Sequence, residues 1–210
     1  MGRPPRHDVD RLLDAAAELV AASGPSTVTV AAVARAARAP SGSIYHRFPS
    51  RSSMLATLWL RTVDRFQDGF LSALNTEPAA RAAPAAARHV VAWSRAHPHE
   101  AHILLYGPAD FDEPNWPLEA RERLERSDRR VRNAVRALAE RLDRREPREV
   151  EQLFLATVDL PYATVRRHQS SGRPIPAYAE DLVTSCAATL VGQPDTCPPP
   201  HPLDQARRSR

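Results

Sequence analysis

Side chains that can bind a polyanion are concentrated in one short interval of the chain. Between residues 29 and 51 the relevant hydroxyls, cations and small residues are Thr29, Arg38, Ser41, Gly42, Ser43, Tyr45, His46, Arg47 and Arg51. Hydroxyl and guanidinium groups donate hydrogen bonds to phosphate oxygens, and short residues let a backbone approach the edges of bases. These residue types therefore suit noncovalent binding of nucleic acid.

The distribution of charge along the chain favours the same partner. Residues 1–67 contain nine arginines and five acidic residues, whereas residues 68–210 contain 20 of each. No carboxylate occurs between Glu18 and Asp64, and the arginines of this interval are Arg35, Arg38, Arg47, Arg51 and Arg61. Because phosphate contacts dominate nucleic-acid affinity and carboxylates repel phosphates, this interval predicts a surface for DNA.

These residues need helices to position them. Apolar residues spaced by three and four predict helices over 8–23, 30–37 and 41–47, and then a long helix from Ser50 to residue 74. Thr29 and Ser50 are predicted N-caps, and Pro40 fits the first turn of the third helix. Two short helices joined by a tight turn predict a helix-turn-helix, whose second helix can lie in the DNA major groove.

Within this unit the side chains divide by the part of DNA that they can reach. The residues predicted to read base edges are Ser41, Gly42, Ser43, His46 and Arg47. Those predicted to contact phosphates are Thr29, Tyr45 and Arg51. Structural alternatives remain: Ser41 and Ser43 could merely begin a helix, Arg47 could be a solvated charge, and Tyr45 could join Phe48 in the core.

The segment from Thr29 to Arg51 resembles the DNA-binding segment of TetR-family transcriptional repressors. The run Gly42-Ser43-Ile44-Tyr45-His46-Arg47-Phe48 has the form Gly-x-hydrophobic-Tyr-x-x-Phe, and the basic Arg51 follows three residues later. The resemblance covers residues 7–67. It implies an all-α fold, with an N-terminal three-helix helix-turn-helix DNA-binding domain and a C-terminal helical ligand-binding and dimerisation domain.

The resemblance also implies what such a protein binds. The expected partners are double-stranded DNA, a second copy of the chain in a homodimer, and a small-molecule effector. The two recognition helices of the dimer would stand about 34 Å apart and read an inverted-repeat operator. The implied function is repression that the effector releases through a change in this spacing.

Two residues depart from the family's pattern. Arg38 stands where the family usually has a glycine in the turn, and Pro40 stands where it often has serine. A residue other than glycine in a left-handed turn costs about 1 to 2 kcal/mol. Either the turn has another shape, or Arg38 is tolerated because its side chain gains a phosphate, and we favour the second explanation.

The rest of the chain predicts further helices, over 79–96, 98–106, 117–145, 147–171 and 176–192. The predicted domains are 1–67 and 68–192, and a proline-rich tail over 193–210 is expected to be disordered. Pro161 lies inside a predicted helix, where it would free the carbonyl of Thr157 and kink the axis. The helix from Pro117 offers ion pairs one turn apart: Glu119/Arg123, Glu122/Arg126, Glu125/Arg129 and Asp128/Arg132.

Large aromatic residues are the candidates for an effector pocket. They are Trp59, Phe66, Trp93, Tyr106, Trp116 and Tyr162, of which at least two are expected to line the pocket. By analogy with the family, the last two helices would pair across the dimer axis. The candidates for that interface are Leu153, Val158, Val165, Leu182, Val183 and Leu190, and an intramolecular core is an equal alternative.

Other classes of protein receive little support. Two cysteines, Cys186 and Cys197, do not make a disulfide framework, and no apolar run is long enough to span a membrane, so a cytoplasmic location is expected. His99 and His102 share a helical face, but no carboxylate or cysteine completes a metal site. We expect no cofactor and no enzymatic activity. A DNA-binding regulator without an effector, constitutive or controlled by a protein partner, remains the alternative.

Overall fold

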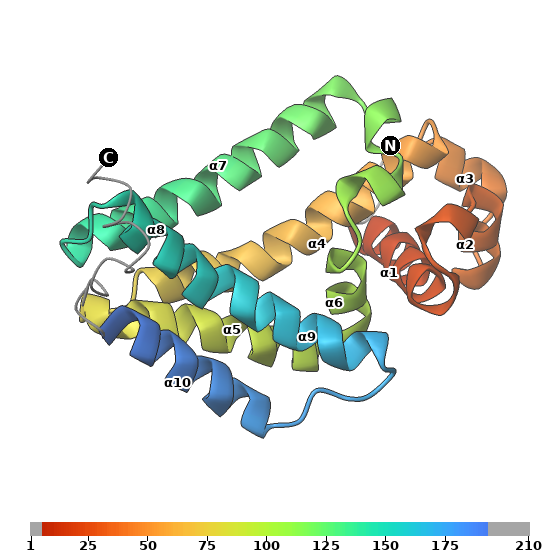
Figure 1. Ribbon diagram of the computed structural model, residues 1–210. Helices are drawn as coiled ribbons and strands as arrows, with labels where there is room; N and C mark the ends of the chain where they lie inside the picture. Colours follow the sequence, from red (N-terminus) through yellow and green to blue (C-terminus); the bar gives the residue numbers. More distant parts are fainter. Residues whose placement is uncertain (1–5, 193–210) are drawn as a thin grey trace, which may run out of the picture.

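The computed structural model describes residues 6–192, which form helices joined by loops and contain no strand (Figure 1). The α-helices are α1 (Arg6–Ser23), α2 (Val30–Ala36), α3 (Ser41–Tyr45), α4 (Arg51–Leu74), α5 (Ala82–Ala96), α6 (Pro98–Leu104), α7 (Leu118–Arg141), α8 (Pro147–Phe154), α9 (Leu160–Ser170) and α10 (Tyr178–Gly192). Short 3-10 helices occur at η1 (Pro25–Thr27), η2 (Ala79–Arg81), η3 (Pro108–Phe111) and η4 (Glu113–Asn115), and η5 (Leu155–Asp159) is a π-helical turn. None of these helices combines the length and the apolar character that crossing a bilayer requires.

The all-α fold predicted from apolar spacing is confirmed, and each predicted helix lies within a few residues of its expected position. Two predicted caps also form. The Oγ1 of Thr29 accepts a hydrogen bond from the Ala32 N–H at 3.1 Å, and the Oγ of Ser50 accepts one from the Ser53 N–H at 3.0 Å. These bonds satisfy amides that the first turn of a helix leaves free, and they fix where α2 and α4 begin. The predicted tail, 193–210, lies outside the described residues.

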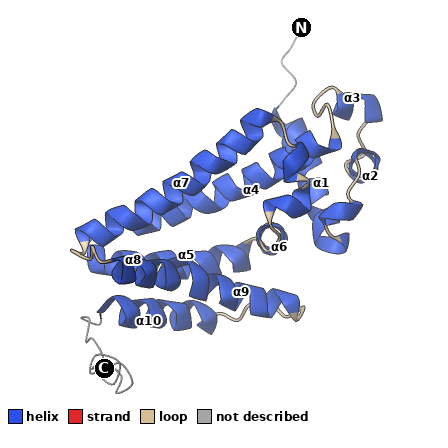
Figure 2. Ribbon diagram, turned by 45° about the horizontal axis from the view of Figure 1, so that its top comes forward, coloured by secondary structure: helices blue, strands red, loops and turns tan. Residues whose placement is uncertain are grey.

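Two apolar cores share the long helix α4. The first core packs α1, α2 and α3 against the first half of α4, and it includes Met54, Leu58 and Val63. The second core begins on α4 at Phe70 and continues through α5, α7, α8, α9 and α10. Figure 2 shows α7 beside α4, with α9 and α10 lying along α5. The cores thus separate on α4 close to residue 67, where the sequence predicts the domain division.

A segment of the second half of the chain completes the first core. Phe111 in η3 is fully buried, with its ring centroid 5.0 Å from that of Trp59. The indole Nε1 of Trp116 donates a hydrogen bond to the carbonyl of Phe111 at 2.7 Å, which closes the η3–η4 segment on itself. The sequence did not predict these turns, because three prolines interrupt the segment and it has no helical period.

Pro161 is accommodated by a π-helical turn. The Leu160 N–H bonds to the carbonyl of Leu155, five residues earlier, so η5 takes up one extra residue before the proline ring. The predicted helix over 147–171 is therefore divided into α8, η5 and α9. Pro161 is buried, and the Oγ1 of Thr157 donates to the carbonyl of Leu153 at 2.7 Å. A π turn of this kind widens the helix locally and often occurs beside a functional site.

The face of α7 forms two of the four predicted ion pairs. Glu122 pairs with Arg126 and Glu125 pairs with Arg129, each at 3.6 Å. The pair Glu119/Arg123 is wrong, because Arg123 reaches across to Asp64 on α4. The pair Asp128/Arg132 does not form within the described residues either. α7 also ends at Arg141, before the predicted residue 145, because Asp143 adopts a left-handed conformation with a φ of 53°.

Replacing Phe111 by alanine tests the contribution of η3 to the first core. We expect Phe111→Ala to lower the free energy of unfolding by about 3 to 5 kcal/mol, because it leaves a cavity between Trp59 and Tyr106. Urea unfolding followed by circular dichroism measures the change. Leu118→Ala is the control, since the Leu118 side chain is 64% exposed and should contribute less than about 0.5 kcal/mol. Equal stability of the two variants would contradict the assignment.

Candidate nucleic-acid interface and effector cavity

α2, a short turn and α3 form the helix-turn-helix. α2 ends in a motif in which the Ala39 N–H bonds to the carbonyl of Ala34 at 2.9 Å and the Arg38 N–H bonds to that of Arg35 at 3.2 Å. This pattern requires a left-handed residue at position 38, and Arg38 has a φ of 51°. The turn thus keeps the shape that usually calls for glycine, and the alternative of a different turn shape is ruled out.

α3 is held to the first core by one face and leaves the other open. Ile44 and Phe48 are buried, which confirms the expectation for Phe48. Tyr45 lies 57% exposed, so the alternative of a core tyrosine is wrong, and His46 is exposed as well. Arg47 is half-buried, and the side chains of Ser41 and Ser43 lie outside the described part of the structure.

Gly42 lies on the open face of α3. A β-carbon built at this position would meet no atom within 4 Å, so the fold itself does not require glycine there. Glycine inside a helix is less stable than alanine. The predicted approach of Gly42 to base edges stays a prediction, and the open space around it is compatible with that role.

Arg51 has a different role from the one that the sequence predicted. Its Nε donates to the carbonyl of Val28 at 2.6 Å, and its Nη2 donates to the carbonyls of Pro25 at 2.7 Å and Ser26 at 3.2 Å. The guanidinium therefore binds the end of η1 and holds the start of α2 against α4. The predicted phosphate contact of Arg51 is replaced by this intramolecular one.

Three of the five arginines in the acid-free interval remain on the surface of the helix-turn-helix. Arg35 and Arg38 are exposed and Arg47 is half-buried. Arg61 instead forms ion pairs with Asp10 at 3.3 Å and Asp14 at 2.8 Å, and only 12% of its side chain is exposed. Thr29 is exposed at the start of α2, where its hydroxyl hydrogen is free to reach a phosphate while its oxygen caps the helix.

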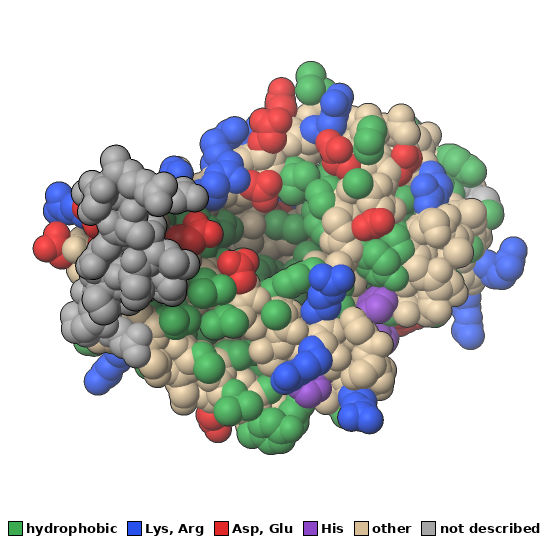
Figure 3. All heavy atoms as spheres, in the orientation of Figure 1, with side chains coloured by type: hydrophobic (Ala, Val, Ile, Leu, Met, Phe, Trp, Pro, Cys, Tyr) green, Lys and Arg blue, Asp and Glu red, His purple; other side chains and the backbone are tan. Residues whose placement is uncertain are grey.

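An apolar cavity of about 220 Å³ lies between α4, α5, α6, α7, η5 and α9. Two of the six predicted aromatic residues, Phe66 and Tyr162, line it, together with Phe70, Val131 and Val158. In Figure 3 the face of the molecule is hollowed between α7 and α9, with apolar side chains in the hollow and acidic side chains along its border. Such an enclosed apolar site with a few polar groups is typical of small-molecule binding.

The other four predicted aromatic residues do not line this cavity. Trp59, Tyr106 and Trp116 pack around Phe111 in or against the first core. Trp93 stacks on His97 at a centroid distance of 4.9 Å and contacts Phe66 edge-on at 5.4 Å. The structure thus places four of the six candidates away from this cavity, because apolar spacing predicts that a face is buried without predicting which neighbour covers it.

Polar residues of the cavity were missed by the sequence analysis. Gln67, Ser94 and Asp128 line it. The Oε1 of Gln67 accepts a hydrogen bond from the Ser127 Oγ at 2.7 Å, and the Ser94 Oγ donates to the carbonyl of Val90 at 2.7 Å. Behind this wall, burial lowers the pKa of His89, and the ring of His89 fills the space that a β-carbon at Gly69 would need.

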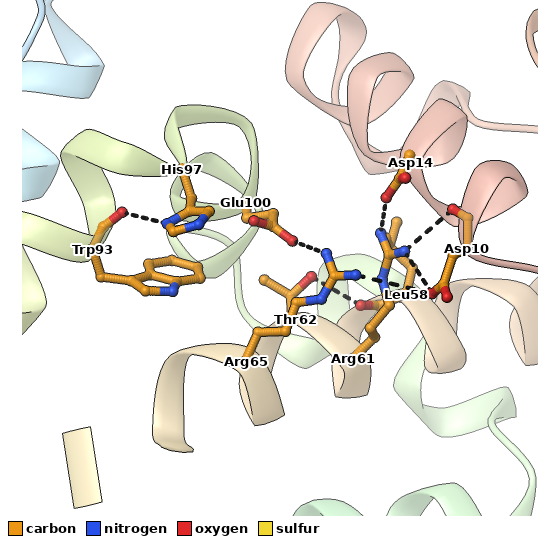
Figure 4. A network of polar contacts seen from close by, with 9 residues as sticks. All are labelled: Asp10, Asp14, Leu58, Arg61, Thr62, Arg65, Trp93, His97 and Glu100. Carbon is orange, nitrogen blue, oxygen red and sulfur yellow. Dashed lines mark hydrogen bonds and ion pairs between the residues drawn. The ribbon is translucent and has the colours of Figure 1, made fainter. Parts of the chain in front are cut away.

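A network of polar contacts joins the cavity wall to α1 (Figure 4). On α4, Arg65 donates to Glu100 of α6 at 2.6 Å and lies 3.9 Å from Asp10 of α1. His97 lies between α5 and α6, and its Nδ1 forms a hydrogen bond with the carbonyl of Trp93 at 3.0 Å. Trp93 in turn contacts Phe66, which lines the cavity. The three helices α1, α4 and α6 therefore meet at one cluster of charges.

The histidines of α6 have structural surroundings. His102 meets Tyr106 edge-on at a centroid distance of 5.4 Å, and His99 is exposed. Among residues 6–192, no three His, Cys, Asp or Glu side chains are grouped closely enough to hold a metal ion.

The candidates for a dimer interface divide between the interior and the surface. Leu153, Val165 and Val183 are buried in the second core, so the intramolecular alternative holds for them, and Val158 and Leu190 pack partly against it. Leu182 is 53% exposed on α10. Sequence reasoning missed two further exposed apolar residues nearby, Leu155 and Tyr178.

α2 and α3 each bury one face in the first core, and a left-handed turn joins them. This arrangement is a helix-turn-helix, a motif of DNA-binding proteins. Residues 12–58 match the family described as bacterial regulatory proteins, tetR family. Residues 12–58 are accordingly similar to the DNA-binding segment of these regulators, in agreement with the resemblance seen in the sequence.

Solved structures share the fold over most of the chain. A regulatory protein of the tetR family from Rhodococcus RHA1 has a TM-score of 0.73 at 17% identity, covering 91% of this chain and 100% of that chain. The fatty acid degradation regulator FadR from Bacillus halodurans has a TM-score of 0.70 at 16% identity, with coverages of 93% and 99%. FadR from Bacillus subtilis, in complex with stearoyl-CoA, has a TM-score of 0.63 at 15% identity, with coverages of 87% and 96%. No curated protein sequence matches the chain.

Replacing Arg38 by glycine separates the effect of this residue on the stability of the fold from its effect on the affinity for DNA. We expect Arg38→Gly to raise the free energy of unfolding by about 0.5 to 1 kcal/mol, because the relief of left-handed strain exceeds the added flexibility of the unfolded chain. The variant should also bind DNA more weakly, with a salt dependence reduced by about one phosphate contact. Asp143→Gly is the matched control, since Asp143 occupies the same position in the same motif at the end of α7 and lies far from α3 in sequence. Unchanged DNA affinity and salt dependence in Arg38→Gly would contradict the phosphate contact.

Adding a methyl group at Gly42 should have opposite effects on the two states. In the free protein Gly42→Ala should stabilise the fold by about 0.5 kcal/mol, since the new β-carbon meets nothing and alanine favours helix. On DNA it should lower affinity by about tenfold. Thermal unfolding and fluorescence anisotropy with duplex DNA measure the two effects. Gly192→Ala, in equally open space on α10, should leave DNA affinity unchanged; a Gly42→Ala variant with full affinity would show that α3 does not closely approach DNA.

Proposed function

We propose that the protein is a homodimeric repressor that binds an inverted-repeat operator through α3 and is released by a small molecule bound in the apolar cavity. The observation that carries the proposal is the open face of α3, where Gly42, Tyr45 and His46 are exposed within a stretch of sequence, 19–63, that contains no carboxylate. Its buried face, anchored by Ile44 and Phe48, gives this helix a fixed orientation. Contacts made by a rigidly held helix can select a DNA sequence.

The roles of individual residues follow from their places. Ser41, Gly42, Ser43, His46 and Arg47 would read base edges, and Thr29, Arg38 and Tyr45 would contact phosphates. Arg51 supports the interface from behind by holding the start of α2. Repression, and not activation, is supported by the resemblance to the family.

The proposed dimer interface includes the exposed apolar residues of η5 and α10. Leu155 is 39% exposed, Tyr178 63% and Leu182 53%. Exposed large apolar side chains of this kind are expected at an interface with another protein. Pairing of α8, η5, α9 and α10 with their copies would bury them, and it leaves α3 of each copy free for DNA.

The proposed effector binds in the cavity and acts on the DNA-binding domain through the contacts that connect the cavity wall to α1. A molecule that separates α4 from α6 would act on the cluster of Arg65, Glu100 and Asp10. The neighbour from Bacillus subtilis contains stearoyl-CoA, which supports an apolar ligand for a fold of this kind. The domain division proposed near residue 67 crosses the wall of the cavity, because Val63, Phe66 and Gln67 precede it and the other lining residues follow it.

Selection from random duplex DNA tests the proposal directly. At a stated salt concentration the purified full chain should enrich an inverted repeat whose half-sites lie about one helical turn apart. Tyr45→Ala should lower the affinity for the enriched site by at least tenfold, a loss of about 1.4 kcal/mol, while its thermal unfolding stays unchanged because Tyr45 is exposed. Enrichment of no sequence, or full affinity of Tyr45→Ala, would refute the assigned interface.

A thermal-shift screen of metabolites tests the effector. A ligand that binds only the folded state raises the midpoint of unfolding by mass action, and it should also lower the affinity for the selected operator. Ligands that stabilise the protein without affecting DNA binding, or the absence of any ligand, would favour the alternative of a regulator controlled by a protein partner or acting constitutively.

A further inference from the structure

The effector cavity contains a single formal charge, and it is negative. Among the described residues that line the cavity, Asp128 is the one carboxylate, and none is arginine, lysine or histidine. The remaining polar residues, Gln67, Ser94 and Tyr162, are neutral, and each has a hydrogen bond within the protein. The electrostatic preference of the cavity is therefore determined by Asp128.

Asp128 lacks the ion pair that two other carboxylates of α7 form. Glu122 and Glu125 each pair with the arginine one turn later, at 3.6 Å. The same spacing places Arg132 one turn after Asp128, yet no ion pair forms between them within the described residues. Arg132 is exposed and does not line the cavity. Asp128 thus lines the cavity without an ion pair to its own helix.

The surroundings of Asp128 make its charge costly. Its side chain is exposed on one side, and the apolar wall that includes Val131 lies on the other. Burial against this wall raises the pKa of Asp128, and the charge of Arg132 opposes the shift. A carboxylate that has lost part of its hydration and forms no close ion pair gains from a cation placed against it.

We propose that the effector is a hydrophobic amine, whose protonated nitrogen binds Asp128 while its apolar body lies against Phe66, Phe70 and Val131. This inference rests on the proposed function, because it takes the cavity as the effector site. A ligand that ends in a carboxylate within the cavity would meet a like charge and no compensating cation. The cavity therefore selects amines over acids of the same length.

Three probes of equal chain length test the selection. Octylamine, 1-octanol and octanoate each contain eight carbons, and at pH 7 their head groups are cationic, neutral and anionic. Isothermal titration calorimetry of the full chain at low salt measures their affinities. We expect octylamine to bind about fivefold more tightly than 1-octanol, and octanoate about fivefold more weakly, as for an ion pair near solvent. Higher salt should reduce both differences.

Variants of α7 identify the residue responsible. Asp128→Asn should remove the preference for octylamine and leave the affinity for 1-octanol unchanged, and Asp128→Arg should favour octanoate. Glu122→Gln is the matched control, since it removes a carboxylate from the same helix at a residue that does not line the cavity. It should keep the preference of the unmodified chain.

The outcomes separate this inference from the proposed function. If 1-octanol binds but octylamine binds no more tightly, or if Asp128→Asn keeps the preference, the role of Asp128 is refuted and the cavity remains an effector site. If none of the three probes binds, both the effector site and the proposed selection are refuted. If Glu122→Gln loses the preference as Asp128→Asn does, the general charge of α7 is responsible and the specific contact is refuted.

Discussion

The burial of one helix in two separate cores is the constraint on which the rest of the structure depends. Met54, Leu55 and Leu58 place the first half of α4 in the core beneath α1, α2 and α3, and Phe70 and Leu74 place its end in the core of the second domain. A helix of 24 residues spans about 36 Å and behaves as a stiff rod over that length. A displacement of α4 by changes around Phe70 must therefore reach the core that holds α3. Phe111 strengthens this link, because it comes from the second half of the chain and is buried beside Trp59.

Local conformational preference is violated where contact with DNA is expected. Three helices, α2, α7 and α9, end in the same hydrogen-bonded motif, with Arg38, Asp143 and Gly172 in the left-handed position. Glycine adopts this conformation freely and aspartate tolerates it, whereas arginine has no local reason to do so. Gly42 is the converse case, because it weakens a helix in which alanine would fit. Each choice lowers the stability of the free protein, and both lie on the helix-turn-helix. Such departures are expected at sites where function outweighs stability.

Periodicity made most of the fold predictable from the sequence, and contacts across the fold were what it could not supply. The helices and the caps at Thr29 and Ser50 follow from local rules, and so does the helix-turn-helix. The role of Arg51 does not, because its carbonyl partners lie more than 20 residues earlier and come close only after η1 folds against α4. The cavity was equally out of reach. Its lining depends on where α4 and α7 diverge, which the sequence does not show. Four of the six aromatic candidates therefore lie elsewhere, and Gln67 was not predicted. Asp128 was expected to pair along its own helix, and in the structure it lines the cavity without that ion pair.

The contacts of α6 determine which part of the molecule can respond to a ligand. Arg61 lies between α1 and α4 with 12% of its side chain exposed and binds two carboxylates of α1, so these helices form a rigid pair. α6 is joined to this pair by Arg65 and Glu100, an ion pair whose arginine is 45% exposed. A pair exposed to this extent contributes about 1 kcal/mol or less. To shift two conformations from a ratio of 1:99 to 99:1, a ligand must bind one of them more strongly by about 5.5 kcal/mol. The loss of this ion pair supplies only a small part of that free energy. Leu104 and Leu105 of the α6 segment also line the cavity. The ion pair is not the only contact that holds α6, because Ala101 and Ile103 of this helix are buried, and Ile103 belongs to the first core. A ligand that displaces α6 therefore acts on the same core that anchors α3 through Ile44 and Phe48.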